Sequence, residues 1–260
     1  MKLTDDAPQN ENFKSLIVKL DADFCRCITT FVSDNVFVPE NNESFKNLDQ
    51  QAQIELTYKR RNLLGQYCKL ILHGILRVFD AANVLQFYIK VVFHNDFGDI
   101  LKTLLQKCRE MDRVSTAKAV AQALITSYDK LKFYTNSFMD PDSDDIADIK
   151  ELAKRFALSF GPDNIRNREA IATIHKDCIT YALELDEARR QGRPVEKPTN
   201  ICFLEVLIEF SAKLVRQDKT SVLKYLERHC PKSSLDEMQA DKYWHPYLLY
   251  RGSLAQSKNA

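Results

Sequence analysis

Apolar side chains recur every three or four positions along most of the chain, which is the pattern of helices with one buried stripe. This spacing predicts about nine or ten helices joined by short loops. The predicted helices cover residues 17–38, 51–73, 81–93, 100–108, 113–138, 146–160, 170–185, 199–215 and 222–230, followed by one opened by Ser233 and Asp236. The sequence predicts a turn at Asn95–Gly98 and the longest central loop at 191–198. It also predicts a short break at Gln217-Asp218 and the end of a helix at Gly161-Pro162.

No stretch alternates strictly between apolar and polar residues, so the fold class is all-α. Antiparallel helix pairs at a period of roughly 40 residues indicate a HEAT-like α-solenoid, although no clean internal repeat is visible. We expect residues 1–12 to form a disordered polar segment, 13–254 to form the helical repeats, and 255–260 to be a polar tail.

Composition and charge narrow the function. The 37 basic residues nearly cancel the 36 acidic ones, so the chain lacks the overall positive charge typical of nucleic-acid-binding domains. Its polar N-terminus is unlike a signal peptide, and no apolar run is long enough for a membrane span. The seven scattered cysteines predict reduced thiols in the nucleus or cytosol.

Residues with catalytic or metal-binding chemistry are sparse. There is no glycine-rich phosphate loop, His-Glu-x-x-His or Cys-x-x-Cys motif. His175 and Cys178 are catalytic residue types, but their helical setting favours a helix-face histidine and a packed thiol. Cys25 and Cys27 point to different helix faces. We therefore expect a non-enzyme without metal, cofactor or small-molecule substrate.

Three sequence features favour binding, each beside a plainer alternative. The Lys59-Arg60-Arg61 run is either a solvated face or a contact for an acidic partner segment. Arg189, Arg190 and Arg193 form either a solvated linker or a weak phosphate contact for nucleic acid. The aromatic run at 243–247 either closes the core or forms a docking pocket.

A set of ordered motifs resembles the stromalin (stromal antigen) family, the HEAT-repeat subunit of cohesin. The matching stretches are FVSDNVF (31–37), KRRNLL (59–64), NDFGDI (95–100), KELAKRFAL (150–158), REAIATIHKD (168–177), FLEVLIEF (203–210), RQDK (216–219) and YR (250–251). They cover most of residues 17–254 and occur in the family's order.

The resemblance implies a nuclear, chromosome-associated scaffold whose surface is wrapped by a segment of a kleisin subunit, and which supports sister-chromatid cohesion. It also implies that the chain is the C-terminal part of a longer solenoid. Family positions that meet the kleisin correspond to the regions of Asp34 and Lys107, and the alternative is that both residues are solvated surface charges. Arg60, Arg61 and Arg109 are weaker candidates. Opposite charges at such positions would set the register of a wrapped peptide.

The sequence also departs from the family. The loop after Phe37 lacks the acidic insertion of common members, and Cys178 with Ala182–Glu184 replaces a glycine and an aromatic-rich run. These differences predict a diverged paralogue, a meiotic one from an insect. Two alternatives stay open, a DNA-binding surface of the cohesin complex and a generic HEAT-repeat adaptor. The identity of the kleisin, and a mitotic or meiotic setting, are not specified by the sequence.

Overall fold

The computed structural model describes residues 20–38, 47–89, 95–135, 144–192, 195–230 and 235–255, and these are helical with no β-strand among them. The chain divides into two compact units, Met1–Asp112 and Arg113–Ala260, each with its own buried apolar residues. The predicted all-α class is confirmed, and the helix pairs are consistent with an α-solenoid.

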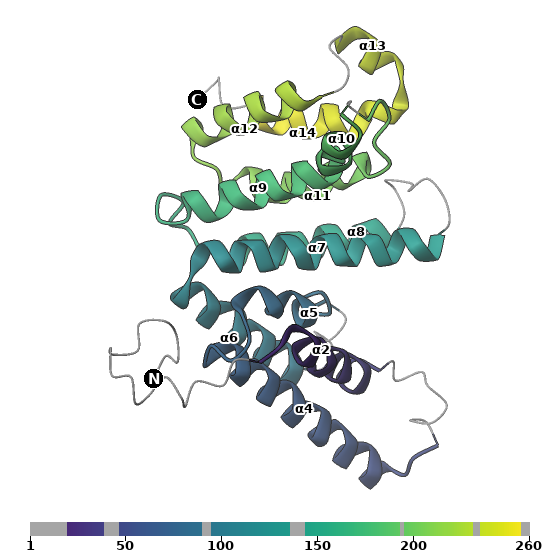
Figure 1. The fold of residues 1–260 in the computed structure, drawn as a ribbon, viewed down its shortest axis with the longest axis vertical. Helices are drawn as coiled ribbons and strands as arrows, with labels where there is room; N and C mark the ends of the chain where they lie inside the picture. Colours follow the sequence, from purple (N-terminus) through teal and green to yellow (C-terminus); the bar gives the residue numbers. More distant parts are fainter. Residues whose placement is uncertain are drawn as a thin grey trace. The chain divides into compact units, whose positions relative to one another are not determined.

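The first unit is built around one long helix (Figure 1). Helix α4 (Gln50–Leu72) packs against α2 (Ala22–Val36) and against α6 (Asn95–Met111). A short 3-10 helix η1 (Val78–Ala81) and α5 (Ala82–Leu85) cover one end. An aspartate caps the N-terminus of α2 and of α4. Asp21 and Asp49 each accept a hydrogen bond from the backbone N–H group three residues later.

The second unit stacks helices in successive pairs. Helices α7 (Arg113–Thr135) and α8 (Asp144–Ser159) form one pair, α9 (Arg168–Ala182) and α11 (Leu204–Ser211) the next, and α12 (Arg216–His229) and α14 (His245–Ala255) the third (Figure 1). Helix α11 contacts α8, α9 and α14, and most of its residues are buried. The shorter elements are α10 (Leu185–Gln191), η2 (Ile201–Phe203), α13 (Leu235–Ala240) and η3 (Lys242–Trp244).

The longer predicted helices are confirmed. Those over 51–73, 146–160 and 170–185 match α4, α8 and α9 to within a few residues, and that over 113–138 matches α7 as far as Thr135, where the described segment ends. Gly161 has φ 73°, the left-handed conformation that ends a helix, as its position before Pro162 indicated. The aromatic run closes the core, since Trp244 and Tyr247 are buried.

Two predictions in the first unit were wrong. Of the helix expected over 81–93, the described residues form the end of η1, α5 and turns at 86–89, and residues 90–93 lie outside the described part of the chain. The turn expected at Asn95–Gly98 is the first turn of α6. Asparagine and aspartate favour helix N-termini as well as turns, so the same residues fit either structure.

Helix α10 was not predicted; it follows Glu184, whose φ of 52° is left-handed, and it ends at Gln191, where the predicted loop begins. Two predictions in the second unit were wrong. The break expected at Gln217-Asp218 lies earlier, at residues 212–215, and α12 already starts at Arg216. Thr199 does not cap a helix, because its N–H and hydroxyl donate to the Glu184 carboxylate.

Several expectations fall on parts of the chain outside the described residues. These are the disordered segment 1–12, the start of the first predicted helix at 17–19, Ser233, and the tail from residue 256. The first predicted helix is seen from Ala22 to Val36.

Candidate partner-binding site

The two residues with the most reactive side chains lie inside the second unit. His175 and Cys178 on α9 have no exposed surface. His175 Nδ1 lies 2.6 Å from the Tyr250 hydroxyl oxygen. Burial lowers the pKa of His175 to about 4 and raises the pKa of the Cys178 thiol, which keeps both groups neutral near pH 7. The interpretation of a packed thiol is confirmed, and the histidine is a buried core residue rather than one on a helix surface.

The described part of the chain contains no cluster of metal-binding side chains and no helix suited to span a membrane. Its His, Cys, Asp and Glu side chains form no group of three arranged to hold a metal ion. None of its helices is long and apolar enough to cross a membrane.

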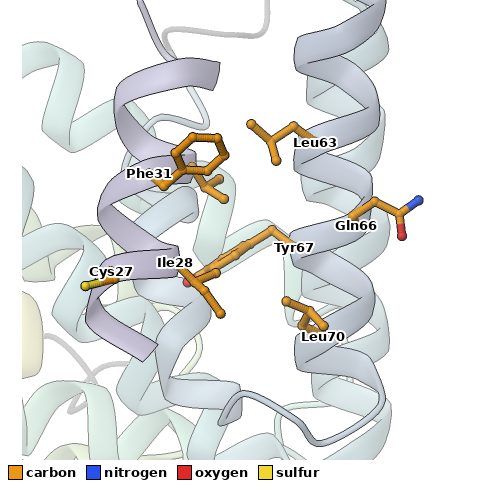
Figure 2. A pocket seen from close by; sticks show the side chains of 8 residues that line it. Cys27, Ile28, Phe31, Leu63, Gln66, Tyr67 and Leu70 are labelled. Atoms are coloured by element: carbon orange, nitrogen blue, oxygen red, sulfur yellow. The ribbon is translucent and has the colours of Figure 1, made fainter. Parts of the chain in front are cut away.

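An apolar groove lies between α2 and α4 in the first unit, and we call it the α2–α4 groove. It has a volume of about 300 Å³ and is lined by Cys27, Ile28, Phe31, Val32, Leu63, Gln66, Tyr67 and Leu70. Figure 2 shows Phe31 opposite Leu63 at one end, with Ile28 and Leu70 toward the other. Cys27 and Gln66 point outward at the two margins.

Tyr67 fixes the floor of this groove. Its hydroxyl donates to the Asp80 carbonyl oxygen at 3.1 Å and lies 3.2 Å from Thr29 Oγ1, so one side chain joins α2, α4 and η1. Burial raises the pKa of Tyr67, which keeps the hydroxyl protonated as a donor. These contacts hold α2 and α4 at a set separation, and the groove is therefore preformed.

Helix α2 presents apolar side chains on two sides. Val32 and Val36 are buried, whereas Phe24 and Phe31 are 51% and 57% exposed. Phe24 and Phe31 are two turns apart, so they lie on one face of α2. The apolar arc of α2 is thus wider than its contact with the core requires.

Asp34 is on α2 but is not among the residues that line the groove. It follows Phe31 by one turn of α2, is exposed, and has no hydrogen bond or ion pair with any described residue. Its charge is therefore available to a partner. The neighbouring rim of α4 differs, because Lys59 pairs with Glu55 at 2.7 Å.

The other charged residues predicted to meet a partner lie on α4 and α6. Arg61 is exposed, and Arg60, the residue before it on α4, is half-buried. Lys107 on α6 is exposed and its Nζ bonds Glu110 at 2.9 Å, while Arg109 is half-buried. All belong to the first unit with Asp34, but Lys107 pairs with its own helix rather than with Asp34.

The predicted nucleic-acid residues lie in the second unit and are locally neutralised. Arg189 pairs with Asp186 at 2.8 Å, and Arg190 pairs with Glu187 at 2.7 Å, both within α10. Arg193 lies outside the described residues. Arg189 and Arg190 therefore add little net positive charge to α10, because each is paired with an acidic residue of the same helix.

The α2–α4 groove was not predicted from the sequence. Phe24, Ile28 and Phe31 fit the buried stripe of a helix, and periodicity alone does not separate a core contact from a groove wall. The one signal was the width of the apolar arc, which extends from Val32 through Ile28 to Cys27.

Comparison with known proteins places this geometry in a family context. Residues 113–258 match the family described as the STAG protein C-terminal domain. The chain is similar to Cohesin subunit SA-1 of Xenopus laevis, with 38% identity over 94% of the chain and 19% of the relative. It is similar to Cohesin subunit scc-3 of Caenorhabditis elegans, with 37% identity over 96% of the chain and 21% of the relative.

A human protein, Cohesin subunit SA-3, is 35% identical over 89% of the chain and 18% of its own length. The chain thus spans about a fifth of the length of the relatives it matches. The family match covers more than half of the chain, and the relatives cover both structural units. The chain belongs to the stromalin (STAG) family of cohesin subunits.

Proposed function

We propose that this chain acts as a non-catalytic helical-repeat scaffold of a cohesin-type complex and binds a segment of the kleisin subunit. The similarity to proteins named as cohesin subunits, at 37–38% identity across nearly the whole chain, supports membership of such a complex. Because the chain spans about a fifth of those relatives, the partner and the cellular role are part of the proposal.

The observation that carries the kleisin assignment is the state of Asp34. Its exposed carboxylate has no described partner and stands beside a preformed apolar groove. A carboxylate in this position can pair with a lysine or arginine of a bound segment without first breaking an internal ion pair. Lys107, already bonded to Glu110, would have to exchange partners and is the weaker of the two candidates.

The cellular role follows from the family. A kleisin-bound stromalin scaffold would reside in the nucleus in association with chromosomes and support cohesion or segregation, in mitosis or in meiosis. The divergence noted in the sequence makes a meiotic kleisin worth testing beside a mitotic one.

Direct DNA binding is less favoured. The α10 arginines are paired with acidic neighbours, and the net charge is only +1. Affinity for duplex DNA depends largely on cations that neutralise phosphates, and these arginines are already compensated. A generic adaptor role would be excluded by selective kleisin binding.

Calorimetric titration tests the proposal. The chain is titrated with central segments of mitotic and meiotic kleisins, with a scrambled segment of the same composition as control. We expect saturable binding of at least one kleisin and none of the scrambled segment. Absence of binding to every kleisin segment would contradict the proposed partner.

A further inference from the structure

We propose that one end of the second unit carries a docking surface for an acidic protein segment with apolar side chains. We call this surface the α8–α9 edge, and it consists of Leu158, Ile165, Arg166, Lys213 and Arg216. All five residues belong to the second unit, whereas the proposed kleisin contact belongs to the first. The inference therefore goes beyond the proposed function and does not depend on it.

Two aliphatic side chains stand in solvent at this edge. Leu158, in the last turn of α8, is 64% exposed, and Ile165, in the loop between α8 and α9, is 77% exposed. The core in this region is formed by Phe156 and Phe160, which are buried. A partner that covered both aliphatic side chains would gain the free energy of removing apolar surface from water.

The backbone around these side chains is held in place by hydrogen bonds and an ion pair. The buried Asn167 amide donates to two carbonyl oxygens of the α8–α9 loop. Lys213 Nζ donates to the Gly161 carbonyl oxygen at 2.7 Å, and Arg168 pairs with Asp218 at 2.7 Å. The α8–α9 loop and the start of α12 are therefore joined at one end of the second unit (Figure 1), and a partner would not have to order them.

The α8–α9 edge carries an excess of positive charge. Arg166 and Arg216 are exposed and have no ion pair with any described residue, and Lys213 bonds a neutral carbonyl group. The carboxylate of the same loop, Asp163, accepts a hydrogen bond from the Arg166 backbone N–H at 2.9 Å. Its single charge offsets only part of that of the three cations.

The adjoining turns of α8, α9, α11 and α12 add further charges that have no ion pair with a described residue. They are the cations Lys154, Lys219 and Lys224 and the carboxylates Glu169 and Glu209. These cations outnumber the carboxylates, so the excess of positive charge persists. Helix α12 has no large apolar side chain among the exposed ones, so the aliphatic contacts are confined to the α8–α9 edge.

The combination of charge and apolar surface selects the occupant. Phosphates of a nucleic acid would satisfy the cations but would leave Leu158 and Ile165 in water. A protein segment with aspartate or glutamate beside leucine, isoleucine or phenylalanine would meet both features. A second copy of this chain fits less well through the same edge, because two positive surfaces repel each other.

Fluorescence anisotropy with synthetic peptides tests the proposal on the full chain. The probe is a labelled peptide of alternating acidic and apolar residues, and two counterparts replace either its acids by lysine or its apolar residues by serine. We expect the probe to bind at least ~10-fold tighter than either counterpart. Equal affinity for the probe and its serine counterpart would reduce the contact to charge alone and overturn the proposal.

Substitutions locate the contact. Ile165→Ser and Arg166→Glu should each weaken binding of the probe at least ~5-fold, and both positions are exposed, so the fold should be kept. Ile75→Ser and Arg228→Glu are the matched controls and should change affinity less than ~2-fold. Ile75 is exposed in the first unit, and Arg228 is an exposed cation at the far end of α12 without an ion pair to a described residue. Control losses as large as those of the edge variants would overturn the docking surface.

Duplex DNA in the same assay covers the alternative ligand. Binding of DNA that Arg166→Glu weakens and Ile165→Ser does not, together with no binding of the probe, would assign the edge to phosphates and overturn the proposal. The kleisin titration is read separately. Failure of the probe to bind while a kleisin segment binds would remove this inference and leave the proposed function standing.

Discussion

His175 on α9 and Tyr250 on α14 form a buried pair, with Nδ1 and the hydroxyl oxygen 2.6 Å apart and the two rings stacked at 5.9 Å between centroids. Both side chains are fully enclosed. The pair joins helices from two successive layers of the second unit, and it places an ionisable group where only its neutral form is tolerated.

Stability of the second unit should therefore fall as the pH drops below about 6.5, the ordinary pKa of histidine. Burial, with a smaller contribution from Lys219, lowers the pKa of folded His175 to about 4. Between these values the unfolded chain binds more protons, so acid favours unfolding. From pH 7 to pH 5 the wild type should lose about 2 kcal/mol more than His175→Gln, which lacks the titrating group.

Urea titration followed by fluorescence measures this difference, because Trp244 is the single tryptophan and is buried in the same unit. Carboxylates that titrate over this range affect both proteins and cancel in the comparison. Parallel pH dependences of the wild type and His175→Gln would contradict the assignment.

The ion pair between Lys150 and Glu205 links α8 to α11 at 2.6 Å, and the Glu205 side chain is only 7% exposed. Lys150→Met should lower the free energy of unfolding by about 2 kcal/mol, because it leaves a buried carboxylate without its cation. The double variant Lys150→Met/Glu205→Leu should lose less than Lys150→Met alone, since no charge is stranded. Urea titrations of the three proteins test this, and a double variant less stable than Lys150→Met would argue against it.

Substitution of Gly161 tests whether its left-handed backbone conformation ends helix α8. Its φ of 73° disfavours any side chain, although no atom lies within 4 Å of an added Cβ. Gly161→Ala should lower the free energy of unfolding by about 1 kcal/mol through backbone strain. Gly252→Ala is the matched control within α14, where a Cβ also meets no atom, and it should raise stability by roughly 0.5–1 kcal/mol. Changes of the same sign in the two variants would contradict this account.

Periodicity predicted the long helices well because a buried stripe leaves the same mark in sequence and structure. The helix α7 is an example, with Ala117, Val120 and Leu124 buried as their spacing indicates. The short helices were not predicted correctly, because they are too short to carry a clear buried stripe in the sequence. Residues 82–85 and 185–191 form helices of one or two turns, which are too short for periodicity to separate from a loop or from a longer helix.

The candidate site was predicted only in part. Family resemblance led to Asp34, but the groove beside it depends on how α2 rests on Tyr67 of α4, a contact between residues far apart in the chain. The ion pairs Lys107–Glu110 and Arg189–Asp186 were also not predicted from the sequence. These acids stand one turn from their partners, so helical spacing could have shown that the positive charges are compensated.

Duplex DNA should bind this chain weakly and with a shallow dependence on salt. Arg189 and Arg190 already pair with Asp186 and Glu187, so they should displace few counterions when the chain binds DNA, and removing them should change the salt dependence little. In fluorescence anisotropy at several salt concentrations, Arg189→Ala/Arg190→Ala should change the slope of log affinity against log salt by less than about one. A change of about two would show that both arginines contact phosphates.

The most direct test of kleisin binding is charge reversal at Asp34, measured by calorimetry with the kleisin segment that binds the wild type. Asp34→Lys should weaken binding at least ~10-fold, about 1.4 kcal/mol, and Lys107→Glu should have a smaller effect because Lys107 is shared with Glu110. Asp186→Lys is the control, an exposed acid of the second unit. If Asp34→Lys binds as tightly as the wild type, Asp34 does not meet the kleisin and the central claim is wrong. If Asp34→Lys alone loses affinity while Asp186→Lys does not, the carboxylate beside the groove is the charged contact of this scaffold.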